Sequence, residues 1–190
     1  MFTFDPDTHY YELDGKELPS VTTILKDAGI IDTSKYATGS AEFGSDVHAA
    51  CELYDLYGEE SADERVKGHL IAWKAFLDRL KPKFTHCEEP IYHQTHIYAG
   101  TPDRVGSLNA HNRTAIIDIK SGHKEPWHAL QSAAYAWCFE KPTLIERMCV
   151  YLRSDGTHSV EYHQRTRLQE DITVFLAALS LRNWRLKHGK

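Results

Sequence analysis

The feature that most constrains this chain is a short apolar run that ends in charge. Residues 114–120 read Thr-Ala-Ile-Ile-Asp-Ile-Lys, a composition that predicts a buried strand. Because side chains alternate along a strand, Asp118 and Lys120 point to one face and Ile119 to the other. A carboxylate and an ammonium at the end of a buried strand are costly unless something uses them. On these residues alone, a salt bridge at the edge of a sheet is an equally good reading.

The hydrophobic pattern along the rest of the chain alternates between helical and extended periods. Helices are expected over residues 21–28, 40–57, 62–80, 127–139 and 168–187. Strands are expected in an N-terminal hairpin over residues 2–4 and 9–13, and later in the chain over 103–108, 114–120, 147–153 and 158–163. The segment 84–98 is rich in β-forming residues and is expected to contain strand pieces at 89–92 and 97–98. This order predicts an α+β sandwich with a mixed central sheet, in which three consecutive strands form an antiparallel meander.

Composition limits the class of protein. The chain has 190 residues, a net charge of −5, 42% hydrophobic and 26% charged residues, which is typical of one globular domain. We expect a single domain over 1–190: a hairpin and short helix in 1–35, a core in 40–165 and a C-terminal helix in 166–190. No apolar run approaches the ~20 residues of a membrane span, and the N-terminus resembles neither a secretory signal nor a transit peptide.

The four cysteines lie far apart and form no CxxC pair, which argues against a zinc ribbon or a clustered iron–sulfur site. They are interpreted as reduced, mostly buried thiols of a cytosolic protein.

Asp103 is a further candidate for the site. It opens the strand before Asp118, and the two carboxylates beside Lys120 would form a hard-oxygen site for Mg²⁺ or Mn²⁺. In strict register across a polar turn at 109–113, we expect Asp103 to lie some way from Asp118, so that a bulge or tilt has to bring them together. A turn or cap after Pro102 is the alternative role for Asp103.

Two helices carry polar residues at helical spacing. Gly44, His48 and Glu52 share one face: Gly44 would admit another backbone, His48 would reach a metal, and Glu52 would orient His48. Gln131 and Tyr135 pair on the helix over 127–139. A structural histidine, and a tyrosine hydroxyl satisfied by Gln131, are the alternatives.

Taken in order, these residues resemble the RecB-type branch of the PD-(D/E)XK nuclease superfamily. The matching motifs are Gly44-x-x-x-His48-x-x-x-Glu52, Gly100-Thr101-Pro102-Asp103-Arg104-Val105, Ile116-Ile117-Asp118-Ile119-Lys120-Ser121-Gly122 and Gln131-x-x-x-Tyr135. The resemblance spans 44–135 and implies a restriction-endonuclease-like core with the order α-βββ-α-β. Some relatives hold an iron–sulfur cluster on one cysteine before the core and three closely spaced after it. Only two cysteines follow the core here, so no Fe–S cluster is expected.

The resemblance also implies a role for each matched residue. The metal ligands would be His48, Asp103, Asp118 and the backbone carbonyl of Ile119. Lys120 would position and help deprotonate the attacking water, and Gln131 and Tyr135 would contact nucleic acid near the scissile phosphate. Asp118 stands where the superfamily more usually has glutamate.

The function implied is that of a Mg²⁺- or Mn²⁺-dependent deoxyribonuclease, an exonuclease on linear or single-stranded DNA in recombination or repair. Its partners would be DNA ends or single strands and a separate recombination or helicase protein, with no membrane, in a bacterial or phage-infected cytoplasm. A structure-specific endonuclease, a degenerate module that grips nucleic acid without cutting, and an adaptor in which the polar set is coincidental are the alternatives.

Overall fold

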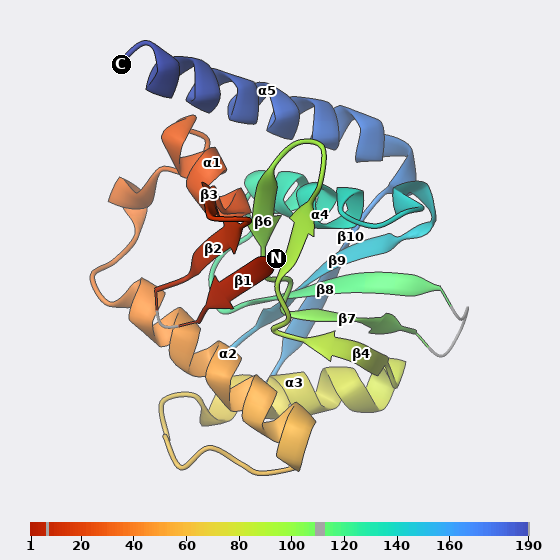
Figure 1. Cartoon of the computed structure of the whole chain (residues 1–190). Helices are drawn as coiled ribbons and strands as arrows, with labels where there is room; N and C mark the ends of the chain where they lie inside the picture. The colour runs from red at the N-terminus through yellow and green to blue at the C-terminus, as the bar shows by residue number, and fades with distance from the viewer. Residues whose placement is uncertain (7, 109–112, 190) are drawn as a thin grey trace.

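The centre of the molecule is a five-stranded mixed sheet, seen in a computed structural model that describes residues 1–6, 8–108 and 113–189. Its strands run in the order β10-β9-β8-β7-β4 (Figure 1). Their bounds are β4 (Lys83–Cys87), β7 (Arg104–Ser107), β8 (Thr114–Lys120), β9 (Glu146–Leu152) and β10 (His158–His163). β8 and β9 are parallel and the other neighbours are antiparallel, so the predicted mixed α+β fold is confirmed.

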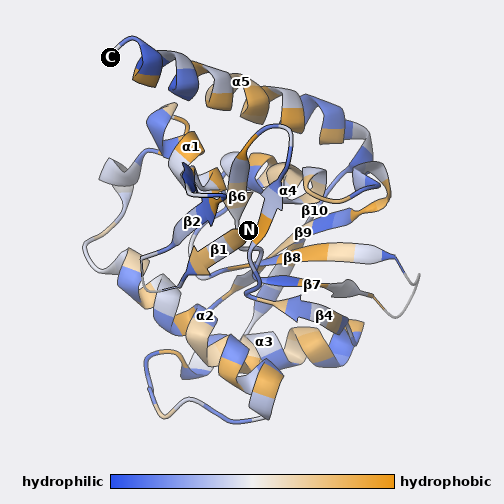
Figure 2. Ribbon diagram, viewed as in Figure 1, coloured by the Kyte–Doolittle hydropathy of each residue, from blue (hydrophilic) through white to orange (hydrophobic). Residues whose placement is uncertain are grey.

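Helices cover both faces of this sheet (Figure 1). One layer holds α2 (Ser40–Tyr57) and α3 (Lys67–Leu80), and the other holds α1 (Val21–Asp27), α4 (Trp127–Trp137) and α5 (Leu168–Lys187). Hydrophobic and hydrophilic residues alternate around α2, α3 and α5, as expected of helices with one face on a core (Figure 2).

Strand β8 divides the two cores by the alternation of its side chains. Ile117 and Ile119 pack under α2 and α3, whereas Ile116 packs with α1, α4 and α5. The same alternation turns Asp118 and Lys120 toward α4. The position of the charged pair therefore follows from the burial of its apolar neighbours.

The N-terminal part forms more strands than the sequence predicts. β1 (Phe2–Asp5) and β2 (Tyr10–Leu13) make the expected hairpin, and β3 (Lys16–Leu18) adds a third strand to it. Later in the chain, the strand pieces expected at 89–92 and 97–98 correspond to β5 (Ile91–His93) and β6 (Tyr98–Gly100), which form a separate two-stranded hairpin. The meander therefore consists of β4, β7 and β8, with this hairpin inserted after β4.

Two ends of helices follow directly from local chemistry. Ser20 caps α1 by accepting a hydrogen bond from the backbone N–H of Thr23 at 3.0 Å. Helix α3 begins at Lys67 and not at 62 as expected, because the Asp63 carboxylate accepts the backbone N–H of Arg65 and holds a turn there.

Three short 3₁₀ turns complete the described structure, over Thr33–Lys35, Pro142–Leu144 and Arg165–Arg167. Most of the predicted turn at 109–113 lies outside the described residues. Among the residues described, no helix combines the length and apolar character that crossing a bilayer requires.

Candidate metal centre

Asp103 and Asp118 meet at the end of the β7–β8 pair. Arg104 pairs with Ile117 and Ser107 with Thr114, so the same register carried one residue further places Asp103 opposite Asp118. The expectation that a bulge or tilt would be needed is wrong, since the two residues lie equally far from the connecting turn. The Asp103 Oδ2 accepts the backbone N–H of Ile119 at 2.5 Å, a group that faces the end of β7.

Three potential metal ligands converge from three different elements. His48 on α2, Glu88 just after β4, and Asp103 before β7 each offer one ligand atom, and these atoms lie within 4.8 Å of one another. The His48 Nδ1 is 3.4 Å from Asp103 Oδ1 and 3.9 Å from Glu88 Oε1. Imidazole and carboxylate donors of this kind suit a small divalent cation.

Glu88 is the member of this cluster that the sequence analysis missed. It lies in no matched motif, and it reaches the site because its backbone has a left-handed φ of 50° at the end of β4. Its backbone N–H donates to the Asp103 carbonyl at 3.0 Å, which ties it to the strand that carries Asp103. The only signal in the sequence is an acidic pair, Glu88-Glu89, directly after a predicted strand.

Asp118 and Lys120 form a contact beside this cluster, with the Lys120 Nζ 2.5 Å from Asp118 Oδ2. Lys120 also donates to the Gln131 Oε1 at 3.0 Å, and the Gln131 Nε2 donates to the Tyr135 hydroxyl at 3.1 Å. The four residues thus form one chain of polar contacts from the end of β8 along α4. These contacts bring together the two motifs that the sequence places at 116–122 and 131–135.

Crowding of negative charge shapes the electrostatics of the centre. Burial, followed by the nearby charge of Asp103, raises the pKa of Glu88 to about 8, and burial raises that of Asp118 to about 6. Burial alone would lower the pKa of His48, but Asp103 raises it to about 9. The carboxylates need a compensating positive charge, which a divalent cation would supply, so the donor set fits such a group.

Lys120 is held in its charged form in this environment. Burial works against the charge, but the carboxylates of Asp118 and Asp103 outweigh it and raise the pKa of Lys120. The buried hydroxyl of Tyr135 likewise has a raised pKa, chiefly because of burial. Both groups can therefore donate hydrogen bonds at neutral pH.

The remaining predicted residues lie at this centre in different ways. Ile119 contributes its backbone N–H to Asp103, and a role for its carbonyl stays a prediction. The carboxylates that contact His48 belong to Asp103 and Glu88, while Glu52 adds its charge to the environment of Glu88. That Glu52 orients His48 stays a prediction.

Two glycines of the matched motifs differ in how much room they have. The expectation that Gly44 admits another backbone is wrong, since the nearest group to an added Cβ is the Ser121 side chain, at an ordinary contact distance of 3.7 Å. An added Cβ at Gly100, in contrast, would lie 2.6 Å from Cε1 of Tyr135. Gly100 therefore makes room for the Tyr135 ring.

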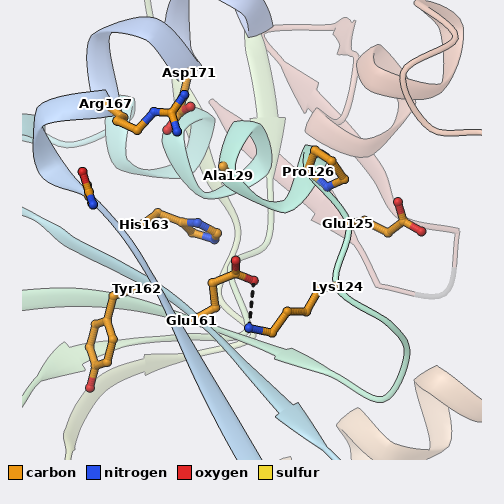
Figure 3. Close-up of a pocket in the computed structure, with 10 residues that line it drawn as sticks. Lys124, Glu125, Pro126, Ala129, Glu161, Tyr162, His163, Arg167 and Asp171 are labelled. Atoms are coloured by element: carbon orange, nitrogen blue, oxygen red, sulfur yellow. Dashed lines mark ion pairs between the residues drawn. The ribbon is translucent and has the colours of Figure 1, made fainter.

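A polar cavity of about 540 Å³ lies between the N-terminal end of α4 and strand β10 (Figure 3). Lys124 pairs with Glu161 across it at 3.8 Å, and Asp171 at its margin pairs with Arg147 at 2.8 Å. The His163 Nε2 lies 3.4 Å from Cys149 Sγ, which is 3.8 Å from Asp118 Oδ2. Lys124, Glu161 and Asp171 thus each have a partner of opposite charge within the described residues.

Comparison with known proteins adds little to this description. The sequence matches no protein-family model, and no curated protein matches it. Among solved structures, SSO0001 gives a TM-score of 0.38 at 14% identity, over 87% of this chain and 78% of that chain. An alkaline exonuclease (LHK-Exo) from Laribacter hongkongensis gives 0.35 at 14% identity, over 90% of this chain and 92% of that chain.

The complex of LHK-Exo with dAMP gives a TM-score of 0.34, again at 14% identity and over 90% and 92% of the two chains. Likeness at this level establishes neither a shared fold nor a shared activity. The function proposed below therefore rests on the geometry of the site.

Proposed function

We propose that this chain is a metal-dependent deoxyribonuclease, an exonuclease that hydrolyses phosphodiester bonds at the ends of linear or single-stranded DNA during recombination or repair. One observation carries the proposal: the His48, Glu88 and Asp103 ligand atoms gather within 4.8 Å, directly beside the Asp118–Lys120 pair. If Asp118 and Lys120 were only a salt bridge at the edge of the sheet, no cluster of ligand atoms would be needed beside them. A cation-dependent hydrolase requires both a ligand cluster and a separate positive side chain.

The metal would be Mg²⁺ or Mn²⁺, held by His48, Glu88, Asp103 and Asp118 with the carbonyl of Ile119. When bound, such an ion lowers the pKa of a coordinated water and neutralises charge that builds on the phosphate. Asp103 is prepared for this role, because the N–H of Ile119 and the imidazole of His48 hold its two oxygens in place. His48 is prepared as well, since it lies on a helix whose opposite face is packed into the core.

The protein's own donors would handle the substrate. Lys120 would hold the attacking water and a phosphate oxygen through its ammonium, which the structure places beside Asp118 and Gln131. Gln131 and Tyr135 would hydrogen-bond the strand next to the scissile phosphate. Because Lys120, Gln131 and Tyr135 bond one another in order, they form a prearranged row of donors on one side of the centre.

Digestion of end-labelled linear, closed circular and single-stranded DNA tests this function. With Mg²⁺ or Mn²⁺ we expect linear and single-stranded DNA to be degraded faster than circles, and EDTA to abolish cleavage. Asp103→Asn should remove activity, while Glu140→Gln, which makes the same change at an exposed position, should keep it. Equal rates on circles identify an endonuclease, binding without cleavage identifies a degenerate module, and strong cleavage in EDTA contradicts the proposal.

A further inference from the structure

Arg104 is a buried charge that no step of the proposed reaction uses. It follows Asp103 in the chain and its side chain is completely buried. Its guanidinium carbon lies 5.9 Å from the ring centroid of Trp73 and 6.0 Å from that of Phe84. A charge in such a position is retained only with well-placed partners, and those partners lead to the metal centre.

One partner anchors the guanidinium away from the cluster. The Arg104 Nε donates to Asp55 Oδ2 at 2.7 Å, and the Trp73 Nε1 donates to Asp55 Oδ1 at 2.9 Å. Asp55 is itself buried and lies on α2, about two helical turns after His48. The same helix thus supplies a ligand and the anchor of Arg104.

The other partners belong to the cluster. The Arg104 Nη1 donates to Glu88 Oε1 at 3.1 Å and to the Asp103 carbonyl at 2.6 Å. That carbonyl also accepts the backbone N–H of Glu88. A glutamate with a left-handed φ is uncommon and costs energy unless its surroundings hold it. The Arg104 guanidinium and the Asp103 carbonyl are the groups that hold Glu88 here.

We infer that Arg104, anchored by Asp55, is a positioning residue that holds Glu88, directly and through the Asp103 carbonyl, in the geometry that binds the metal. The inference rests on the proposed function, because it assigns Glu88 a place among the ligands. It also distinguishes Arg104 from a purely structural ion pair: a change at Arg104 has to alter metal affinity, and it has to act through Glu88.

The test is a calorimetric Mn²⁺ titration of Arg104→Lys beside the parent. Lysine keeps the charge but has one nitrogen on a flexible stem, so it cannot bond Asp55, Glu88 and the Asp103 carbonyl together. Loss of a group that orients a ligand lowers metal affinity by about 10–100-fold, and we expect a loss in that range. Circular dichroism melting of each variant shows whether the protein titrated is folded.

Arg147→Lys is the matched control. Arg147 is the other fully buried arginine of the described residues, and it donates to Asp171 at 2.8 Å and to the carbonyls of Ala129 and Gln164. Among the described residues, each of the two arginines leaves one guanidinium nitrogen without a partner. We expect Arg147→Lys to lower the melting temperature but to bind Mn²⁺ as the parent does.

A double mutant separates positioning from general damage. In a Glu88→Ala background, which lacks the ligand that Arg104 holds, Arg104→Lys should cause little further loss of Mn²⁺ affinity. If Arg104→Lys does not fold, Asp55→Asn weakens the same anchor and should lower Mn²⁺ affinity in the same direction.

Parent-like Mn²⁺ affinity in the folded Arg104→Lys or Asp55→Asn variant, or an unchanged loss without Glu88, overturns the inference and leaves the nuclease proposal standing. A parent that binds no Mn²⁺ overturns both.

Discussion

Replacement of Gly100 by alanine tests whether the position of Tyr135 depends on one missing side chain. An added Cβ would lie 2.6 Å from Cε1 of Tyr135 and 3.2 Å from Cγ2 of Val21. The first distance is well inside van der Waals contact, so the ring has to move. Because the Tyr135 hydroxyl accepts from Gln131 at 3.1 Å, such a shift also disturbs the donor row that begins at Lys120.

The size of the effect follows from the crowding. Overpacking in a close-packed core costs about 1–3 kcal/mol. In a chain of 190 residues, each kcal/mol lowers the melting temperature by about 2–4 °C, which gives a decrease of about 2–12 °C. DNA cleavage should fall as well, measured at a temperature at which both proteins are folded.

The assay is thermal melting by circular dichroism beside single-turnover cleavage. Gly122→Ala is the control, because an added Cβ there meets nothing within 4 Å. We expect its free energy of unfolding to lie within about 0.5 kcal/mol of the parent's. In a Tyr135→Ala background, Gly100→Ala should cost less, since the closest contact is gone. A Gly100→Ala protein that melts and cleaves like the parent refutes the reasoning.

Three further changes probe the surroundings of the centre. Lys120→Ala should bind Mn²⁺ at least as tightly as the parent, because no ligand is lost, yet cleave about 100-fold or more slowly; normal cleavage would show that the lysine is misassigned. Gly44→Ala should raise the melting temperature, since an alanine inside α2 is worth up to about 1 kcal/mol and meets only ordinary contact; a lower melting temperature contradicts that packing. Burial lowers the pKa of His128 to about 3, so the unfolded chain binds a proton that the folded chain does not, and stability falls as the pH drops below about 6.5. Between pH 6.5 and 4.5, denaturant unfolding should show that the parent loses up to about 3 kcal/mol more of its free energy of unfolding than His128→Gln does. An equal loss in the two proteins would contradict the lowered pKa of His128.

The helices and strand β8 could be predicted because their signals are local. The apolar run at 114–120 and the helical periods over 40–57 and 168–187 agree with β8, α2 and α5. The start of α3 was misplaced, since the turn that Asp63 holds competes with helix formation. A short strand such as β3 has too few residues for an alternating pattern to be visible.

The assembly of the site depends on contacts that the sequence pattern does not display. The pairing of Asp103 with Asp118 is set by the register of β7 and β8, in which Ser107 faces Thr114. Glu88 enters only because its backbone turns left-handed after β4.

The anchor of Arg104 was hidden in a different way. Asp55 lies on an amphipathic helix and resembles an ordinary solvated residue in the sequence, although its side chain is buried against Trp73. Such contacts come from tertiary packing and not from propensity.

The most direct test of the central claim is an anomalous difference map from crystals grown with Mn²⁺. We predict a peak bounded by His48, Glu88 and Asp103, next to the Asp118–Lys120 pair, and the loss of that peak in Asp103→Asn crystals. The same parent preparation should cleave linear DNA with Mn²⁺ and not with EDTA. A map without a peak at these residues, from protein whose cleavage requires Mn²⁺, would place the metal elsewhere and contradict the account.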